Sequence, residues 1–171
     1  FWCTLRILFT FVCLLFQYAG MSFVDFAHLK ERNIKNGILD YNRQKTGTPM
    51  RLEILDTAEL MRKELMGDKK PASGYLFPFL SGTKTGYEAY LEYNAALSRF
   101  NRNLKALKKA AGIASDVTSY TIRHSFAMAL KEQNVPIEMI SELLGHKSIK
   151  TTQIYLRSFS LEKMTEVNST C

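Results

Sequence analysis

The sequence has 171 residues, of which 46% are hydrophobic; this suits one domain with a buried core and excludes a disordered chain. A formal net charge of +7 fits a polyanionic partner such as nucleic acid without establishing one. Cys3, Cys13 and Cys171 form no CxxC or Cys/His cluster, so we expect reduced thiols, a cytoplasmic location and no structural zinc.

The first 21 residues are unusually apolar. Residues 7–16 are nearly all apolar and follow Arg6, as in the core of a signal peptide, but the run is too short to span a bilayer. We expect a buried first helix that ends near Tyr18. A membrane anchor formed by residues 1–18 is the alternative. Because the sequence begins with Phe1, we also expect a fragment rather than a protein with a targeting signal.

Turn-forming residues predict a small sheet in the next segment. Asn36-Gly37 favours a tight hairpin turn, and Thr46-Gly47-Thr48-Pro49 marks a second turn. Extended runs over residues 38–45 and 50–55 flank the second turn. These runs predict a three-stranded antiparallel sheet with Lys45 at the tip of a hairpin.

Helices account for most of the remaining chain. They are expected over residues 22–29, 56–67, 87–111 and 120–133, as two short helices within 136–156, and over 160–167. In the longest, Leu97, Phe100, Leu104 and Leu107 recur at helical spacing and form a buried stripe. The predicted fold class is therefore α+β, mainly helical, in a single domain over residues 1–171.

The other sides of the longest helix are basic, with Arg99, Arg102, Lys105, Lys108 and Lys109. Such a face is either simply solvated or in contact with a DNA backbone, and the sequence leaves both interpretations open. Arg99, Arg102 and Lys109 are candidate DNA contacts. Ser148, suited to cap the last short helix, and Lys150 are two more.

Several polar side chains are suited to chemistry on a phosphodiester. A tyrosine hydroxyl such as that of Tyr155 is a poor nucleophile, because its pKa is about 10. Attack on a phosphate therefore needs cations, and the planar fork of Arg123 matches a phosphate. A histidine can donate a hydrogen bond or carry a proton, and Lys45 could protonate the leaving 5′-oxygen. No metal or other cofactor is implied.

Each residue alone also has an ordinary interpretation. Tyr155 could be a surface tyrosine, His146 a helix-exit residue and Lys45 a turn lysine. His124 could be a buried histidine bonded to backbone. Arg123, on an otherwise apolar helix, is harder to dismiss, because burying a guanidinium without a partner is costly.

Their order and spacing resemble the catalytic domain of the tyrosine recombinase (phage integrase) family, from about Gly20 to Phe159. Two short sequence segments are similar to those in integrases of conjugative and mobilizable elements: Gly20-Met21-Ser22-Phe23-Val24-Asp25 and Arg43-Gln44-Lys45-Thr46-Gly47. The most specific match runs from Leu143-Leu144-Gly145-His146 to Tyr155. The resemblance implies that Tyr155 is the nucleophile, Arg123 the second catalytic arginine, His146 the late histidine and Lys45 the hairpin lysine. His124 matches a frequent neighbour of that arginine.

Two positions depart from the family pattern. Tyr120 stands where the second motif usually begins with histidine; it can still donate a hydrogen bond but carries no positive charge. The first catalytic arginine is missing, because the candidate positions hold Ala19 and Ser22. Arg6, Lys30 and Arg51 are considered as substitute cations. Loss of one preorganised donor typically costs about 10²–10³ in rate, so we expect weak cleavage.

The resemblance implies site-specific recombination of double-stranded DNA through a 3′-phosphotyrosine link. It also implies a tetramer on DNA that exchanges C-terminal segments, here residues 160–171, and a monomer without DNA. The family's N-terminal DNA-clamping domain is expected to be absent from this chain. A non-enzymatic alternative is a module or recombinase remnant that only binds DNA, because residues 136–156 read as a helix-turn-helix.

Overall fold

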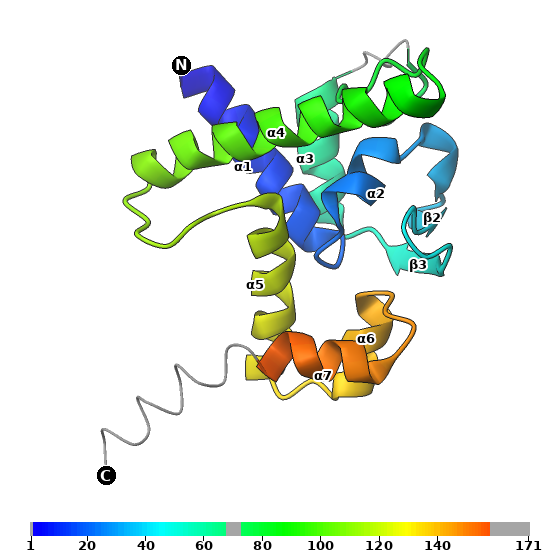
Figure 1. Cartoon of the computed structure of the whole chain (residues 1–171), viewed down its shortest axis with the longest axis vertical. Helices are drawn as coiled ribbons and strands as arrows, with labels where there is room; N and C mark the ends of the chain where they lie inside the picture. The colour runs from blue at the N-terminus through cyan, green and yellow to red at the C-terminus, as the bar shows by residue number, and fades with distance from the viewer. Residues whose placement is uncertain (1, 68–72, 158–171) are drawn as a thin grey trace.

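The computed structural model describes residues 2–67 and 73–157 (Figure 1). Helices predominate, and three short strands lie between the second and third α-helices. The elements in chain order are α1 (Trp2–Gln17), α2 (Phe23–His28), the 3₁₀ turn η1 (Glu31–Asn33), β1 (Ile34–Lys35), β2 (Ile38–Asn42), β3 (Pro49–Glu53), α3 (Asp56–Met66), α4 (Gly86–Ala110), α5 (Ser119–Glu132), α6 (Ile137–Leu143) and α7 (Ile149–Arg157). The predicted mainly helical α+β class is confirmed, while the predicted helix over 160–167 lies outside the described residues.

The sheet is antiparallel in the order β1-β2-β3. Its first turn is Asn36-Gly37, with φ of 52° and 74°, the left-handed pair that a tight hairpin turn needs. Tyr41 pairs with Met50 across β2 and β3. The strand expected over 38–45 ends earlier, at Asn42, because Gln44 to Thr46 form the second turn. Lys45 therefore lies in that turn, as predicted.

Helix α1 is a central element of the core. Leu14 and Leu15 are fully buried, and the helix packs against α3, α4 and α5. The prediction of a buried first helix is confirmed for one face of α1, whereas Ile7 and Phe9 are exposed. In the described part of the chain, no helix is both long enough and apolar enough to cross a membrane.

The irregular segment that precedes α4 is tied to the same core. Leu76 and Phe77 are buried, and the Phe77 ring stacks on Phe26 of α2 with centroids 4.3 Å apart. The amide of Leu76 also donates to the carbonyl of Leu29 at 2.6 Å. Apolar side chains therefore fix this loop in place.

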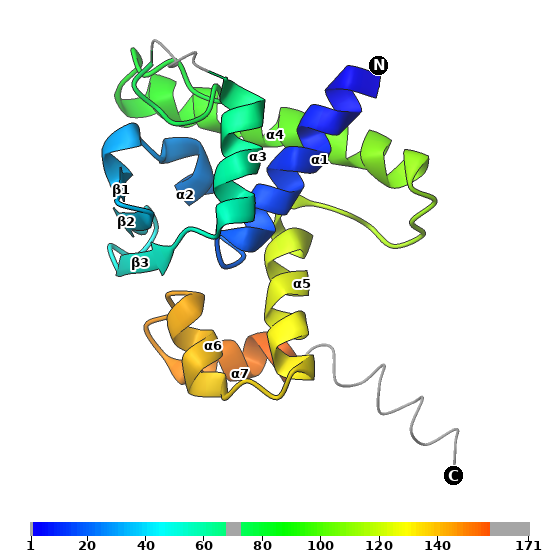
Figure 2. The same cartoon turned by 180° about the vertical axis from the view of Figure 1, so that it is seen from behind.

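Helix α4 buries one stripe and exposes its basic side. Phe100 and Leu104 are buried as expected, whereas Leu97 and Leu107 are only partly buried and Ala96 completes the contact. Figures 1 and 2 show α4 at one end of the long axis of the molecule and α7 at the other.

A second, smaller apolar cluster holds α6 and α7 against α5. Its buried members are Ala127, Ile140, Leu144 and Leu156. Helix α5 joins the two clusters, because Ile122 belongs to the large one and Ala127 to the small one. The polar residues of the candidate site, among them Arg123, lie where these two clusters meet.

Candidate active site

Arg123 is buried on α5 with only 7% of its surface exposed. The N-terminus of this helix is fixed by Thr118, whose side chain accepts a hydrogen bond from the amide of Thr121. A buried guanidinium needs partners, and Arg123 has two distant ones. Its Nη1 donates to the carbonyl of Gly20 at 2.8 Å, and its Nη2 donates to the carbonyl of Leu144. Arg123 therefore links the end of α1 to the end of α6.

His146 follows a glycine that ends α6. Gly145 has a φ of +61°, which lets the chain leave the helix toward the site. The Nδ1 of His146 shares a hydrogen bond with the hydroxyl of Thr152 at 2.8 Å. Burial, followed by the charges of Arg123 and Arg43, lowers the pKa of His146 to about 4. His146 is therefore neutral near pH 7 and suited to hydrogen bonding.

Tyr155 is brought into contact with three of the predicted residues. It lies on α7, which Ser148 caps by accepting a hydrogen bond from the amide of Lys150 at 3.3 Å. Its ring centroid is 4.9 Å from that of His124, 5.6 Å from that of Tyr120 and 5.9 Å from that of His146. The structure thus gathers Tyr120, His124, His146 and Tyr155 around one point.

The protonation of Tyr155 follows from its surroundings. Burial, followed by its interactions with Tyr120, raises the pKa of the Tyr155 phenol above its ordinary value, and Arg123 partly opposes this. The neutral phenol therefore dominates, and attack on a phosphate requires its proton to leave. Burial also lowers the pKa of His124, so this ring too favours its neutral form.

Other predicted residues lie apart from this cluster. Lys45 is exposed in the β2–β3 turn and forms no ion pair with any described residue. Lys150 is exposed in the first turn of α7. Arg99, Arg102 and Lys109 are exposed on α4, toward the opposite end of the molecule (Figure 1). The predicted DNA contacts thus occupy two separate regions.

Neither candidate position for the missing arginine supplies a cation. Ala19 is buried with a φ of 54°, and the Ser22 hydroxyl donates to Asp25 at 2.5 Å. The three substitutes considered from sequence lie elsewhere. Arg6 pairs with Glu64 at 3.2 Å, Lys30 lies 5.2 Å from the ring centroid of Tyr75, and Arg51 is exposed on β3.

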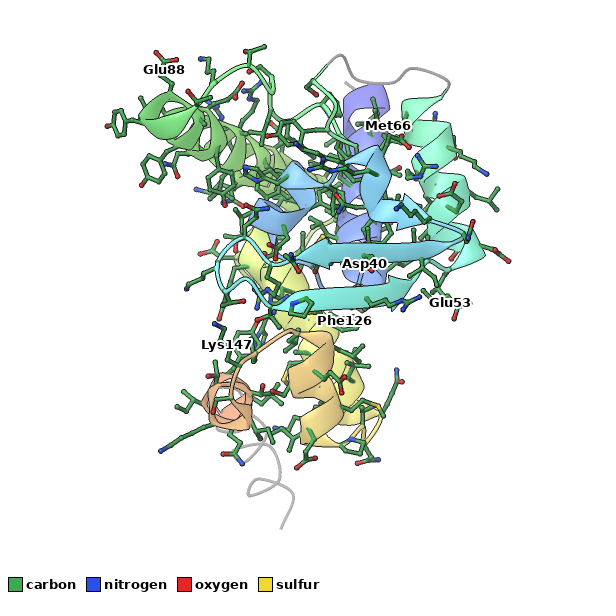
Figure 3. All side chains as sticks on the ribbon, turned by 90° about the vertical axis from the view of Figure 1, so that its right-hand side faces the viewer. Asp40, Glu53, Met66, Glu88, Phe126 and Lys147 are labelled. Carbon is green, nitrogen blue, oxygen red and sulfur yellow. The ribbon has the colours of Figure 1, made fainter. Side chains whose placement is uncertain are left out.

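A second buried arginine, Arg43, lies beside Arg123 and was not among the residues predicted from the sequence. Its Nη1 donates to the carbonyls of Leu144 at 3.1 Å and Gly145 at 2.9 Å. Its Nε donates to Asp25 at 3.4 Å. Figure 3 shows the β2–β3 hairpin lying beside the loop that joins α6 to α7.

A signal for Arg43 does exist in the strand pattern. Leu39, Tyr41 and Arg43 alternate with exposed residues, and all three are buried. Because alternate residues of a strand face the same side, continuing the apolar alternation by one step points Arg43 inward. The family resemblance, by contrast, implies a role only for Lys45 in this segment.

The cluster contains two phenols, two neutral imidazoles and two buried guanidiniums, a set suited to phosphate rather than to a metal ion. Guanidiniums bind phosphate oxygens in a fork, and imidazoles donate hydrogen bonds. Among the residues that the structure describes, no three His, Cys, Asp or Glu side chains are gathered in a way that could hold a metal ion.

Comparison with solved structures identifies the class of fold. XerA recombinase superposes with a TM-score of 0.62 and 23% identity, over 87% of this chain and 55% of that chain. The Tn1549 transposon integrase, in complex with a circular intermediate DNA, gives a TM-score of 0.63 with 15% identity, over 85% of this chain and 52% of that one. A lambda integrase dimer bound to a COC′ core site gives 0.60 with 20% identity, over 90% and 42%. The fold is that of a tyrosine recombinase catalytic domain.

The sequence comparisons agree with the fold. The pattern of the phage integrase family matches residues 5–162, and the chain therefore belongs to that family. It is 52% identical over 54 residues to tyrosine recombinase XerD of Lacticaseibacillus casei, which is 32% of this chain and 18% of the relative. It is 46% identical over 59 residues to tyrosine recombinase XerC of Rickettsia canadensis (strain McKiel), which is 34% and 19%. The match thus spans about a fifth of the length of these curated relatives.

Proposed function

We propose that this chain is the catalytic domain of a site-specific recombinase that cleaves and rejoins double-stranded DNA. The observation that carries the proposal is the convergence of Tyr155 with His124 and His146 next to buried Arg123. These residues come from α5, the end of α6 and α7. A surface tyrosine without a function would need no such surroundings.

In the proposed reaction, the Tyr155 oxygen attacks a DNA phosphate and loses its proton to solvent water. The new bond joins this oxygen to phosphorus, and the bond from phosphorus to the 5′-oxygen breaks. Lys45, in the exposed turn, donates a proton to the leaving oxygen, which departs as a 5′-hydroxyl. A 5′-hydroxyl of the partner duplex then attacks the 3′-phosphotyrosine link and restores the phenol. The link retains the energy of the phosphodiester, so the exchange needs no nucleotide cofactor.

Arg123 and His146 have supporting roles in this proposal. Arg123 binds the non-bridging oxygens, whose negative charge increases in the transition state. His146 donates a hydrogen bond to the same phosphate as a neutral imidazole, with Thr152 fixing the ring. Tyr120 and His124 pack around the nucleophile and orient it.

The proposed partner is double-stranded DNA, bound by a tetramer in which each protomer passes its C-terminal segment to a neighbour. That segment, residues 160–171, lies outside the described residues. We propose that the chain is a monomer without DNA and acts in the cytoplasm. The net charge of +7 supports a polyanionic partner.

A covalent-adduct assay tests this proposal. The chain is incubated with nicked duplexes from a panel of candidate sites, on which the short strand that carries the 5′-hydroxyl diffuses away after cleavage and traps the adduct. We expect an adduct with the wild type and none with Tyr155→Phe, because the substitution removes only the hydroxyl. DNA affinity should change less than about twofold, since a lost hydroxyl removes no charge.

The control is Tyr90→Phe, which removes the hydroxyl of an exposed tyrosine on α4 and should leave the adduct unchanged. An adduct that persists in Tyr155→Phe would contradict the assignment of the nucleophile. Absence of any adduct with the wild type across the panel, together with tight DNA binding, would favour the second candidate, a module that binds DNA without cleaving it. That candidate is motivated by the non-basic residues Ala19 and Ser22 and by the packing of α6 on α7.

A further inference from the structure

We propose that Arg43 is the second cationic clamp on the scissile phosphate and replaces the arginine that is absent at positions 19 and 22. This inference rests on the proposed recombinase function. It assigns to the β2–β3 hairpin a catalytic residue additional to Lys45. The side chain would approach the phosphate from the hairpin, whereas Arg123 approaches from α5.

Arg43 and Arg123 lie close to each other. Arg43 Nη1 and Arg123 Nη2 both donate to the carbonyl oxygen of Leu144. The two guanidiniums therefore lie side by side. Among the described residues, the Nη2 of Arg43 has no hydrogen-bond acceptor, so one edge of its fork is available to a ligand. A phosphate that touches both guanidiniums would have its two non-bridging oxygens neutralised.

The guanidinium groups of Arg43 and Arg123 repel each other electrostatically. Arg43 is 9% exposed and Arg123 is 7% exposed, so two like charges are held together away from water. The pKa of Arg123 is lowered first by burial and second by the charge of Arg43. The second cause is the repulsion between the two guanidiniums. Asp25 provides a single compensating carboxylate at Arg43. Such an arrangement is costly unless an anion joins it, and a DNA phosphate is an anion of the right shape.

The position of Arg43 is fixed by hydrogen bonds to a carboxylate. Asp25, on α2, accepts hydrogen bonds from Arg43 Nε and from the amide of Gln44 at 2.7 Å. The same Oδ2 that accepts from Arg43 also accepts from the Ser22 hydroxyl. Ser22 stands at one candidate position for the missing arginine and here supports the carboxylate that holds Arg43. The residue that departs from the family pattern and the proposed replacement thus belong to one network.

Gly145 allows the close approach. A Cβ at this position would lie 2.7 Å from Arg43 Cδ and 2.5 Å from Met50 Sδ. The absence of a side chain thus leaves room for the arginine to pass beneath the loop that carries His146. The hairpin and the α6–α7 loop therefore fit together at Arg43.

The experiment compares Arg43→Gln with Arg51→Gln, a matched control at an exposed arginine on β3 of the same hairpin. Adduct formation is timed on two nicked duplexes, one with the natural phosphate and one with a single methylphosphonate at the scissile position. The methylphosphonate lacks one negative oxygen and therefore needs one clamp fewer. On the natural phosphate we expect Arg43→Gln to be slower than wild type by about 10²–10³-fold and Arg51→Gln to be unchanged.

On the methylphosphonate, the deficit of Arg43→Gln should shrink to within about tenfold of wild type. A purely structural role predicts equal losses on both substrates, and that result would overturn the inference. Wild-type rates in Arg43→Gln would also overturn it while leaving the recombinase proposal intact. No adduct with the wild type on any panel duplex would overturn both.

A reciprocal variant adds a second criterion. Ser22→Arg alone should not be faster than wild type, because the clamp is already present and the substitution removes the hydroxyl that supports Asp25. Ser22→Arg combined with Arg43→Gln should recover at least about tenfold over Arg43→Gln on the natural phosphate. If circular dichroism shows that Arg43→Gln is unfolded, Arg43→Lys replaces it, since it keeps the charge but loses the fork. The same relief on methylphosphonate is then expected, and its absence contradicts the inference.

Discussion

Burial favours the neutral forms of Tyr155 and of the two histidines beside it, His124 and His146. The phenol stays protonated and His146 stays neutral, while Arg43 and Arg123 remain the cations of the site. The site at rest is therefore positive without holding a charged histidine. In the proposed reaction, a DNA phosphate would meet two guanidiniums that are already fixed in place. The neutral histidines nearby could donate hydrogen bonds without adding to the repulsion between these two positive charges.

This neutral histidine makes stability depend on pH. The pKa of His146 is about 4 in the folded protein and about 6.5 in an unfolded chain, so the unfolded state binds more protons between these values. The contribution of His146 to the free energy of unfolding should therefore be complete above pH 6.5, and the free energy of unfolding should fall as the pH drops toward 4. His146→Gln should reduce this loss. Urea midpoints at pH 7.5 and pH 5 measure it.

Some pH dependence should persist in His146→Gln, because burial lowers the pKa of His124 in the same direction. His28→Gln, on α2 and outside the site, is the matched control and should retain the wild-type loss. An unchanged loss in His146→Gln would mean that His146 is not protected from protonation by the fold.

At the scale of elements, α4 presents a basic surface away from the proposed nucleophile, Tyr155. Arg99, Arg102 and Lys109 are exposed there, and the helix lies at the far end of the molecule from α7 (Figure 2). A duplex that reaches both regions would have to extend across much of one face. The alternative is that this surface is only solvated.

Salt dependence distinguishes these interpretations. If each of the three side chains contacts a phosphate, neutralising all three to Gln should reduce the slope of log K against log salt by about three. Each single substitution should reduce it by about one, whereas Lys63→Gln, exposed on α3, should not change it. A triple variant with the wild-type slope would show that this face of α4 is solvated. Binding is measured by fluorescence anisotropy of a labelled duplex at several salt concentrations.

The elements themselves were predictable where the signal was local. Asn36-Gly37 placed the first hairpin, and both predicted ends of α4 lie within one residue of the observed ends. Arg43 was missed because its partners Leu144 and Gly145 are 101 and 102 residues away in sequence, and hydropathy alone favours an exposed arginine. The position of Tyr155 beside His124 likewise followed from family resemblance rather than from any local pattern.

At the scale of the whole molecule, the site lies between two apolar clusters of unequal size. The larger one includes α1, the sheet and α4, while the smaller one holds α6 and α7 on α5. Hydrogen bonds from Arg43 and Arg123 to the Leu144 carbonyl cross between them. The segment that carries Tyr155, the proposed nucleophile, is therefore held by few buried side chains.

This arrangement predicts that α6 and α7 unfold locally more readily than the helices of the larger cluster. In hydrogen exchange of the wild type, amides of α7 should exchange faster than those of α1. Ile140→Ala removes a side chain that is 1% exposed in the small cluster, and should lower the protection of α7 by about 2–5 kcal/mol. Protection of α1 should stay near the wild-type value, whereas the control Leu14→Ala in the large cluster should lower both. Equal losses in α1 and α7 for Ile140→Ala would show that the two clusters unfold as one unit, and the nucleophile would then have no separate freedom to move.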